Sequence, residues 1–214
     1  MVTARPSRRG ISPAVALAGA GASAWWLYRR LVAGDLSLDL DVGRTVRPLG
    51  PIELRVQARR EVVFDVIAAP YLGTMPASLE GKIEILERSD QMVLAAHRTP
   101  AGGAVATTVE TVRFERPSAV HFRLVRGPVP LVLEAFLLEV DGEETVLRYR
   151  GELHADLWGI GRWWGGLVAR RWDEAVASSL EQIKAVAEER AGAHRRRTER
   201  PIATQPAHPP ETTQ

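Results

Sequence analysis

The feature that most constrains the fold is a run of short strand patterns, from Lys82 to Ala155, that leads into one long helix pattern. Turn signals divide this run at Ser89-Asp90, Pro100 to Gly103, Arg116-Pro-Ser118, Gly127 to Pro130 and Asp141-Gly142. Short connections of this kind join antiparallel neighbours, so we expect six strands in a meander.

The helix pattern begins after Asp156 and continues for roughly seven turns. Its apolar stripe consists of Ile160, Trp164, Leu167, Val168, Trp172, Ala175, Val176, Ser179, Ile183 and Val186. A stripe of this length has to be covered by another layer of structure. The sequence therefore predicts an α+β fold in which a curved antiparallel sheet wraps the long C-terminal helix and encloses an apolar cavity.

The residues before the meander predict a further strand and two short helices. Polar and apolar residues alternate from Ile52 to Ala58, and Glu61 to Ala68 has helical spacing. Pro70 and Pro76 are expected to break that helix, and Gly81 to end a second short one. The expected order is β-α-α-β6-α, with seven strands in a domain that spans residues 51–190.

The ends of the chain are expected to lie outside this domain. Residues 1–35 are basic and contain eighteen uncharged residues, 11–28, that end in Trp25, Trp26 and Tyr28. Arginines flank this stretch, which fits a membrane anchor, but an export signal or a soluble helix are alternatives. Residues 36–50 are predicted to be an extended linker or short strand, and residues 191–214 a disordered tail.

Composition excludes several classes of function. The 28 basic and 26 acidic residues leave a net charge of +2, which is too weak a bias to indicate a nucleic-acid partner. The absence of cysteine removes disulfides and thiolate catalysis. Gly19, Gly21 and Ala24 match a dinucleotide fingerprint, but a Rossmann sheet needs βαβ units that are not expected here. No histidine pair has metal-ligand spacing, so we expect neither a cofactor nor a metal.

The order of elements resembles the START and Bet v1-like helix-grip superfamily (SRPBCC), which includes polyketide cyclase/dehydrase-like proteins. The resemblance rests on the segments 52–58 and 60–67, the Phe114-Glu-Arg-Pro117 turn and the tryptophan-rich last helix, and it covers about 140 residues. It implies a helix-grip fold and the binding of a lipid-, steroid- or polyketide-like molecule, or cyclase or hydrolase activity. No catalytic motif matches, so the resemblance assigns no catalytic residue.

Strand parity predicts which polar side chains face inward. Val112 and Phe114 place Thr108 and Glu110 inside. By the same reasoning Phe122 and Leu124 place Arg126 inside, Val132 and Phe136 place Glu134, and Leu147 and Leu153 place Tyr149. We expect Glu110 to lie opposite Arg126, Arg126 to lie diagonal to Glu134, and Gly151 to lie opposite Glu134.

This cluster has three interpretations. It is a structural ion network, a polar anchor for the head of an apolar ligand, or a catalytic site in which a desolvated glutamate is a general base. His97 is expected near Thr108, and Trp164 and Trp172 are expected to form a wall of the cavity. The predicted ligand-binding residues are Glu110, Arg126, Glu134, Tyr149, Trp164, Trp172 and His97.

The leading functional prediction is the binding of a hydrophobic or amphipathic small molecule, in a protein that is cytoplasmic or associated with a membrane through residues 11–28. The alternatives are a polyketide cyclase, aromatase or dehydratase, and a non-catalytic interaction protein of the cell envelope. The sequence leaves both enzymatic activity and oligomeric state open.

Overall fold

The computed structural model describes residues 13–73, 75–101 and 104–198. Its helices are α1 (Pro13–Val32), α2 (Arg60–Leu72) and α3 (Trp158–Thr198), with one 3₁₀ turn, η1 (Ala77–Leu79). The expected second short helix is this single 3₁₀ turn. Residues 1–12 and 199–214, which include the start of the proposed anchor and most of the expected tail, lie outside the described residues.

Seven strands form one antiparallel sheet. They are β1 (Thr45–Val56), β2 (Ile83–Arg88), β3 (Met92–Ala101), β4 (Ala104–Glu115), β5 (Ala119–Arg126), β6 (Leu131–Asp141) and β7 (Glu144–Ala155). The strands β2 to β7 are consecutive neighbours, and β1 pairs with β7 at the other edge. This arrangement confirms the predicted meander and the predicted fold class.

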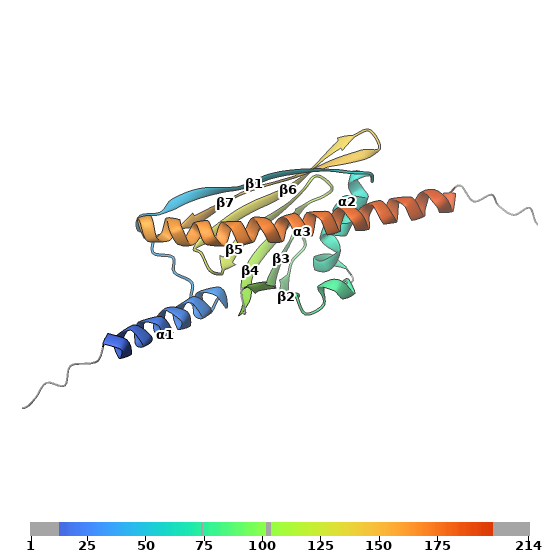
Figure 1. Cartoon of the computed structure of the whole chain (residues 1–214). Coiled ribbons are helices and arrows are strands. Elements are labelled where there is room, and N and C mark those ends of the chain that lie inside the picture. Colours follow the sequence, from blue (N-terminus) through green and yellow to red (C-terminus); the bar gives the residue numbers. More distant parts are fainter. Residues whose placement is uncertain (1–12, 74, 102–103, 199–214) are drawn as a thin grey trace, which may run out of the picture.

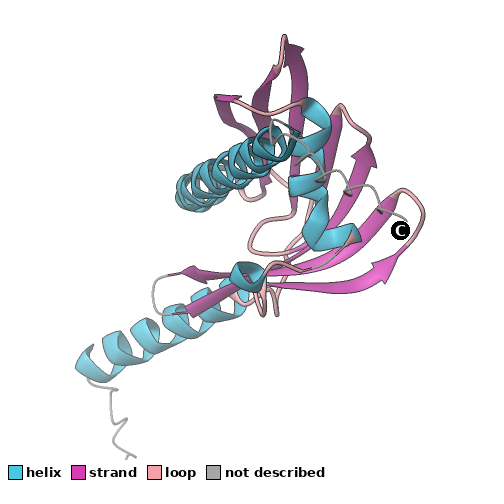
Figure 2. Cartoon of the chain, turned by 90° about the vertical axis from the view of Figure 1, so that its right-hand side faces the viewer, coloured by secondary structure: helices cyan, strands magenta, loops and turns pink. Residues whose placement is uncertain are grey.

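The sheet is strongly curved, and α3 runs along its concave side (Figure 1). Seen along α3, the strands form an open half-ring around the helix, with α2 filling part of the space (Figure 2). α1 extends away from the sheet and approaches it only at its C-terminal end (Figure 1). None of the described helices combines the length and the hydropathy needed to cross a bilayer.

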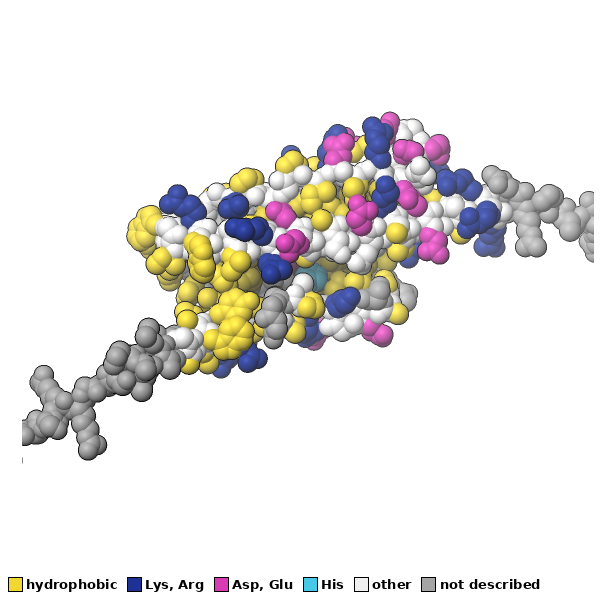
Figure 3. Space-filling view, viewed as in Figure 1, with side chains coloured by type: hydrophobic (Ala, Val, Ile, Leu, Met, Phe, Trp, Pro, Cys, Tyr) yellow, Lys and Arg dark blue, Asp and Glu magenta, His cyan; other side chains and the backbone are white. Residues whose placement is uncertain are grey.

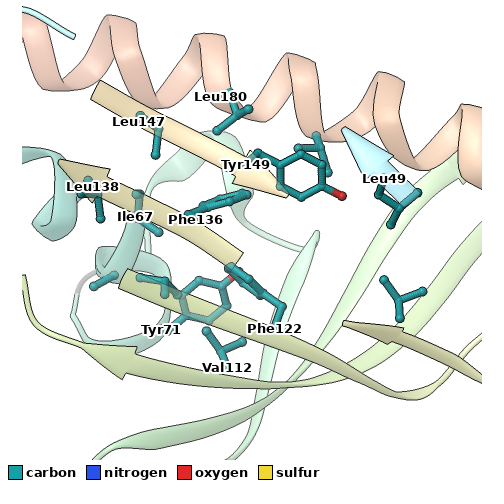
Figure 4. Packing of buried hydrophobic residues seen from close by; sticks show 14 of the residues in the cluster. Leu49, Ile67, Tyr71, Val112, Phe122, Phe136, Leu138, Leu147, Tyr149 and Leu180 are labelled. Atoms are coloured by element: carbon teal, nitrogen blue, oxygen red, sulfur yellow. The ribbon is translucent and has the colours of Figure 1, made fainter. Parts of the chain in front are cut away.

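The core lies between α3, α2 and the concave face of the sheet. Figure 4 shows Leu180 of α3 above Leu147, with Tyr71 of α2 beside Phe122. A row of aromatic rings crosses this core, because the centroids of Tyr71 and Phe122, Phe122 and Phe136, and Phe136 and Tyr149 are 6.1, 5.2 and 5.8 Å apart. The row begins and ends with a tyrosine, so each end carries a hydroxyl group.

Several element boundaries differ from expectation. Pro70 lies inside α2, near its C-terminal end, and the helix continues to Leu72 with Gly73 as its C-cap. β1 begins at Thr45, within the segment expected to be a linker, whereas residues 36–42 form no strand. α3 continues to Thr198, because the residues after Arg190 are mostly good helix formers and no proline intervenes.

Candidate functional site

The first polar group beneath α3 is built on β3 and β4. His97 is paired with Thr108 across these strands, so both side chains project from the concave face. Glu110 is only 5% exposed. Its Oε2 lies 3.1 Å from His97 Nδ1, and its Oε1 accepts a 2.6 Å hydrogen bond from the Thr108 hydroxyl. On the other side of the imidazole, the Tyr71 hydroxyl lies 3.1 Å from His97 Nε2.

These contacts favour an ion pair between His97 and Glu110. Burial alone would lower the pKa of His97, but the negative charge of Glu110 and the hydrogen bond between them outweigh burial and raise it. Burial would raise the pKa of Glu110, and the attraction to His97 with the hydrogen bonds from His97 and Thr108 lowers it instead. The pair is therefore held in its charged form inside the protein.

The second polar group is centred on Glu134 of β6. Its Oε2 accepts a 2.8 Å hydrogen bond from the Tyr149 hydroxyl and a 2.7 Å bond from Trp172 Nε1 of α3. Gly151 lies opposite Glu134, as expected. A Cβ atom at Gly151 would lie 2.7 Å from the backbone oxygen of Leu133 and 2.8 Å from the Cβ atom of Glu134, so only glycine allows this close approach of β6 and β7.

Burial, followed by the negative charge of Glu110, raises the pKa of Glu134 to about 7, despite the opposing hydrogen bonds from Trp172 and Tyr149. A carboxyl group with this pKa gains and loses its proton near neutral pH. Glu134 can therefore accept a hydrogen bond from a bound molecule or exchange a proton with it.

The prediction that Arg126 faces inward is wrong. Arg126 is paired with Val109 while Leu124 is paired with Glu110, so Val125 is an extra residue between two rungs of the ladder. Such a β-bulge reverses the side-chain parity that follows it. Arg126 is consequently exposed, and its Nε donates to the backbone oxygen of Gly34. Glu110 is partnered by His97 in place of Arg126.

The two tryptophans expected to line the cavity lie in different places. Trp172 bonds directly to Glu134, whereas the indole N–H of Trp164 donates to the backbone oxygen of Pro128 at 2.8 Å. The Trp164 ring also meets Tyr28 of α1 edge-on, with centroids 6.1 Å apart. Trp164 therefore belongs to the end of the molecule where α1 meets α3.

Two residues that the sequence analysis did not select have structural importance here. The Tyr71 hydroxyl bonds to Nε2 of His97, the ring nitrogen that does not face Glu110. Asp156 is buried and accepts hydrogen bonds from the backbone N–H groups of Leu40 and Asp41, at 2.7 and 3.0 Å, and from Arg44 Nε at 2.8 Å. These bonds attach the segment before β1 to the start of α3. In the described part of the chain, no three metal-ligating side chains are grouped so as to hold an ion.

Figure 3 shows a recess between α3 and the strands below it. A separate pocket of about 380 Å³ lies near the start of α3, where Arg47 of β1 and Arg162 of α3 line it. A smaller one of about 200 Å³ lies beside Pro51 and Arg148. Neither of these pockets is lined by Glu110, Glu134 or His97.

Several solved structures resemble this chain. The Zhui aromatase/cyclase from Streptomyces sp. R1128 is 19% identical, with a TM-score of 0.50 over 72% of this chain and 97% of that one. Norcoclaurine synthase from Thalictrum flavum, in complex with dopamine and hydroxybenzaldehyde, is 13% identical, with a TM-score of 0.54 over 69% of this chain and 89% of that one.

A third similar structure is the di-domain ARO/CYC StfQ from the steffimycin biosynthetic pathway. It is 18% identical, with a TM-score of 0.51, and the match covers 85% of this chain and 62% of that one. No family model and no curated protein matches the chain. At these identities the likeness establishes the fold.

The protonation of Glu134 should make stability depend on pH. Its pKa in the folded state lies above that of an ordinary glutamate, so the folded state binds this proton more tightly. Stability should therefore fall as the pH rises from about 4.5 to about 7. Glu134→Gln keeps an oxygen for Tyr149 and Trp172 but carries no charge. Relative to wild type, its free energy of unfolding should be higher at pH 8.5 than at pH 5 by on the order of 2–3 kcal/mol, because only wild type loses stability over this range.

Urea unfolding of both proteins at the two pH values measures this difference. Because Glu134 is the only group replaced, the comparison cancels the titration of groups that lie far from it. His97 is an exception, since the charge of Glu134 helps to raise its pKa. Parallel stability curves for the two proteins would show that Glu134 has an ordinary pKa.

Proposed function

We propose that this chain, whose fold is the helix grip of the START/Bet v1-like superfamily, binds a hydrophobic or amphipathic small molecule between the sheet and α3. The observation that carries the proposal is the bonding of Glu134. Both of its hydrogen bonds end on Oε2. Among the described residues no group donates to Oε1, and this oxygen is not fully buried. This oxygen is available to a ligand.

The charges beside the recess restrict the polar group of the ligand. Glu110 is held as an anion, and Glu134 is an anion above about pH 7. A carboxylate or phosphate on the ligand would be repelled by both groups. A hydroxyl, phenol or other neutral donor fits better, because it can bond to Oε1 of Glu134 while the apolar part of the ligand contacts the aromatic row and Trp172.

The fold is consistent with such a ligand. Two of the similar structures are aromatase/cyclases, and norcoclaurine synthase was solved with two small aromatic molecules bound. These proteins support the proposal only through their similar fold. The evidence for a binding site comes from the residues of this chain.

A second candidate function is that of a cyclase, aromatase or dehydratase. The specific observation in its favour is the pKa of about 7 for Glu134, which suits a general acid or base at neutral pH. This function requires the same bound molecule, so binding is the first property to test.

Native mass spectrometry of protein purified without detergent, followed by solvent extraction, tests binding directly. We expect one small molecule per chain, with an apolar body and a neutral hydroxyl or phenol group. Glu134→Gln should reduce its occupancy, because the ligand loses its charged acceptor. Glu139→Gln is the matched control on the same strand, since Glu139 is exposed and pairs with Arg148. Equal occupancy in both variants would contradict the proposed role of Glu134.

A further inference from the structure

One end of the molecule exposes an unusual number of large apolar side chains. They are Trp25 and Trp26 of α1 and Trp158, Ile160, Trp163 and Leu167 of α3. We call these six residues the aromatic end. Figure 3 shows hydrophobic side chains gathered where α3 begins and continuing onto α1. The two helices are joined there, because Tyr28 stacks on Trp25 with centroids 5.4 Å apart and meets Trp164 edge-on.

The α3 part of the aromatic end faces away from the sheet. The opposite side of this helix is buried through small residues, including Gly165, whose Cβ position lies 3.0 Å from the Cβ of Ala155. Ile160 and Trp163 remain 73% and 69% exposed. With Leu167 they share one face of the helix, at a spacing of three and four residues. A soluble surface rarely leaves such a contiguous patch uncovered.

Arginines surround the aromatic end. Arg47 and Arg162 line the pocket of about 380 Å³ at the start of α3. Neither makes an ion pair with another of the described residues. The guanidinium group of Arg30 lies 5.3 Å from the centre of the Trp26 ring. The nearby acidic groups are already paired, Asp35 with Arg30 and Asp39 and Asp41 with Arg44.

We propose that the aromatic end binds the surface of an anionic lipid bilayer. Tryptophan favours the level of the lipid head groups, and the arginines would attract anionic lipids. The pocket between Arg47 and Arg162 would accept a lipid phosphate, because two guanidinium groups match its geometry and charge. α1 carries no acidic residue and would lie in the interface rather than span the bilayer.

A bilayer explains these features better than a protein partner does. α1 projects from the domain as a single helix (Figure 1), and its described C-terminal half exposes Trp25, Trp26 and Leu27 together. A partner protein would need one surface whose shape is complementary to both α1 and α3. A bilayer can contact both helices, because its lipids rearrange around them. Binding of the aromatic end to a bilayer is independent of small-molecule binding beneath α3. It can therefore be tested without the small molecule.

Co-sedimentation of the full-length protein with vesicles tests the proposal. We expect binding to phosphatidylcholine vesicles that contain about 30 mol% phosphatidylglycerol, and weaker binding to pure phosphatidylcholine. Ile160→Ser/Trp163→Ser should weaken binding to both roughly tenfold, because it removes the apolar contact. Leu86→Ser/Val140→Ser is the matched control, since these exposed apolar residues lie on β2 and β6. Its binding should equal that of wild type.

The arginine pocket is tested separately. Arg47→Gln/Arg162→Gln should bind the anionic vesicles no better than the neutral ones, while Arg123→Gln, an exposed residue of β5, should keep the wild-type preference. The proposal would be overturned if wild type binds neither vesicle or if Ile160→Ser/Trp163→Ser binds as wild type does. A wild-type dimer that this variant converts to a monomer, as measured by sedimentation velocity, would also overturn it, because a second copy would then cover the patch.

Discussion

Replacing Glu110 by alanine should destabilise the protein by about 3–5 kcal/mol at pH 6, because it leaves His97 without its buried partner. The Thr108 hydroxyl also loses its acceptor. At this pH both members of the pair are charged in the folded state, since the pKa of Glu110 is lowered and that of His97 is raised. Urea unfolding of the two proteins measures the loss.

Glu84→Ala provides the matched control. Glu84 on β2 also pairs with a cationic residue, Arg98, but both side chains are about half exposed. Its loss should cost less than about 1 kcal/mol. Similar losses for the two variants would contradict a buried ion pair at Glu110.

Glu110→Gln separates charge from shape in the same site. The amide keeps an oxygen for Thr108 but removes the negative charge, so burial of His97 is then opposed only by the charge of Glu134, the smallest of the effects on its pKa. We expect the pKa of His97, followed by NMR, to fall below that of an ordinary histidine. An unchanged histidine pKa would mean that Glu110 does not control its protonation.

Strand periodicity was sufficient to predict most of the inner face. The alternation in β4, β6 and β7 is regular, so Thr108, Glu110, Glu134 and Tyr149 lie on the side that parity predicts. The same reasoning failed for Arg126 because the bulge at Val125 adds one residue without interrupting the apolar pattern of Phe122 and Leu124. A single inserted residue changes the partner of Glu110 from one neighbouring strand to the other.

Contacts between distant segments could not be predicted from periodicity. Tyr71 reaches His97 only because α2 continues past Pro70, and a proline in a helical pattern normally indicates a helix end. Arg44 and Asp156 are far apart in the sequence, and their pairing depends on the antiparallel contact of β1 with β7. No pattern in the neighbouring sequence indicates either pair, because a single charged or aromatic residue could pair with many others in the folded chain.

Selectivity for a hydroxyl group should be the second large effect. 2-Naphthol and 2-methylnaphthalene have nearly the same size, and only the first can donate a hydrogen bond. At pH 8 Glu134 is mainly ionised, because its pKa is about 7. A hydrogen bond to a charged acceptor contributes about 1.5–3 kcal/mol. Wild-type protein should therefore bind 2-naphthol at least roughly tenfold more tightly than 2-methylnaphthalene.

Fluorescence titration of both compounds into wild type, Glu134→Gln and Glu139→Gln at pH 8 is the most direct test of the central claim, that Glu134 holds the polar group of a ligand beneath α3. The ratio of the two affinities should fall to a few-fold in Glu134→Gln and stay at the wild-type value in Glu139→Gln. Equal affinities of wild type for the two compounds, or a ratio that Glu134→Gln leaves unchanged, would contradict it.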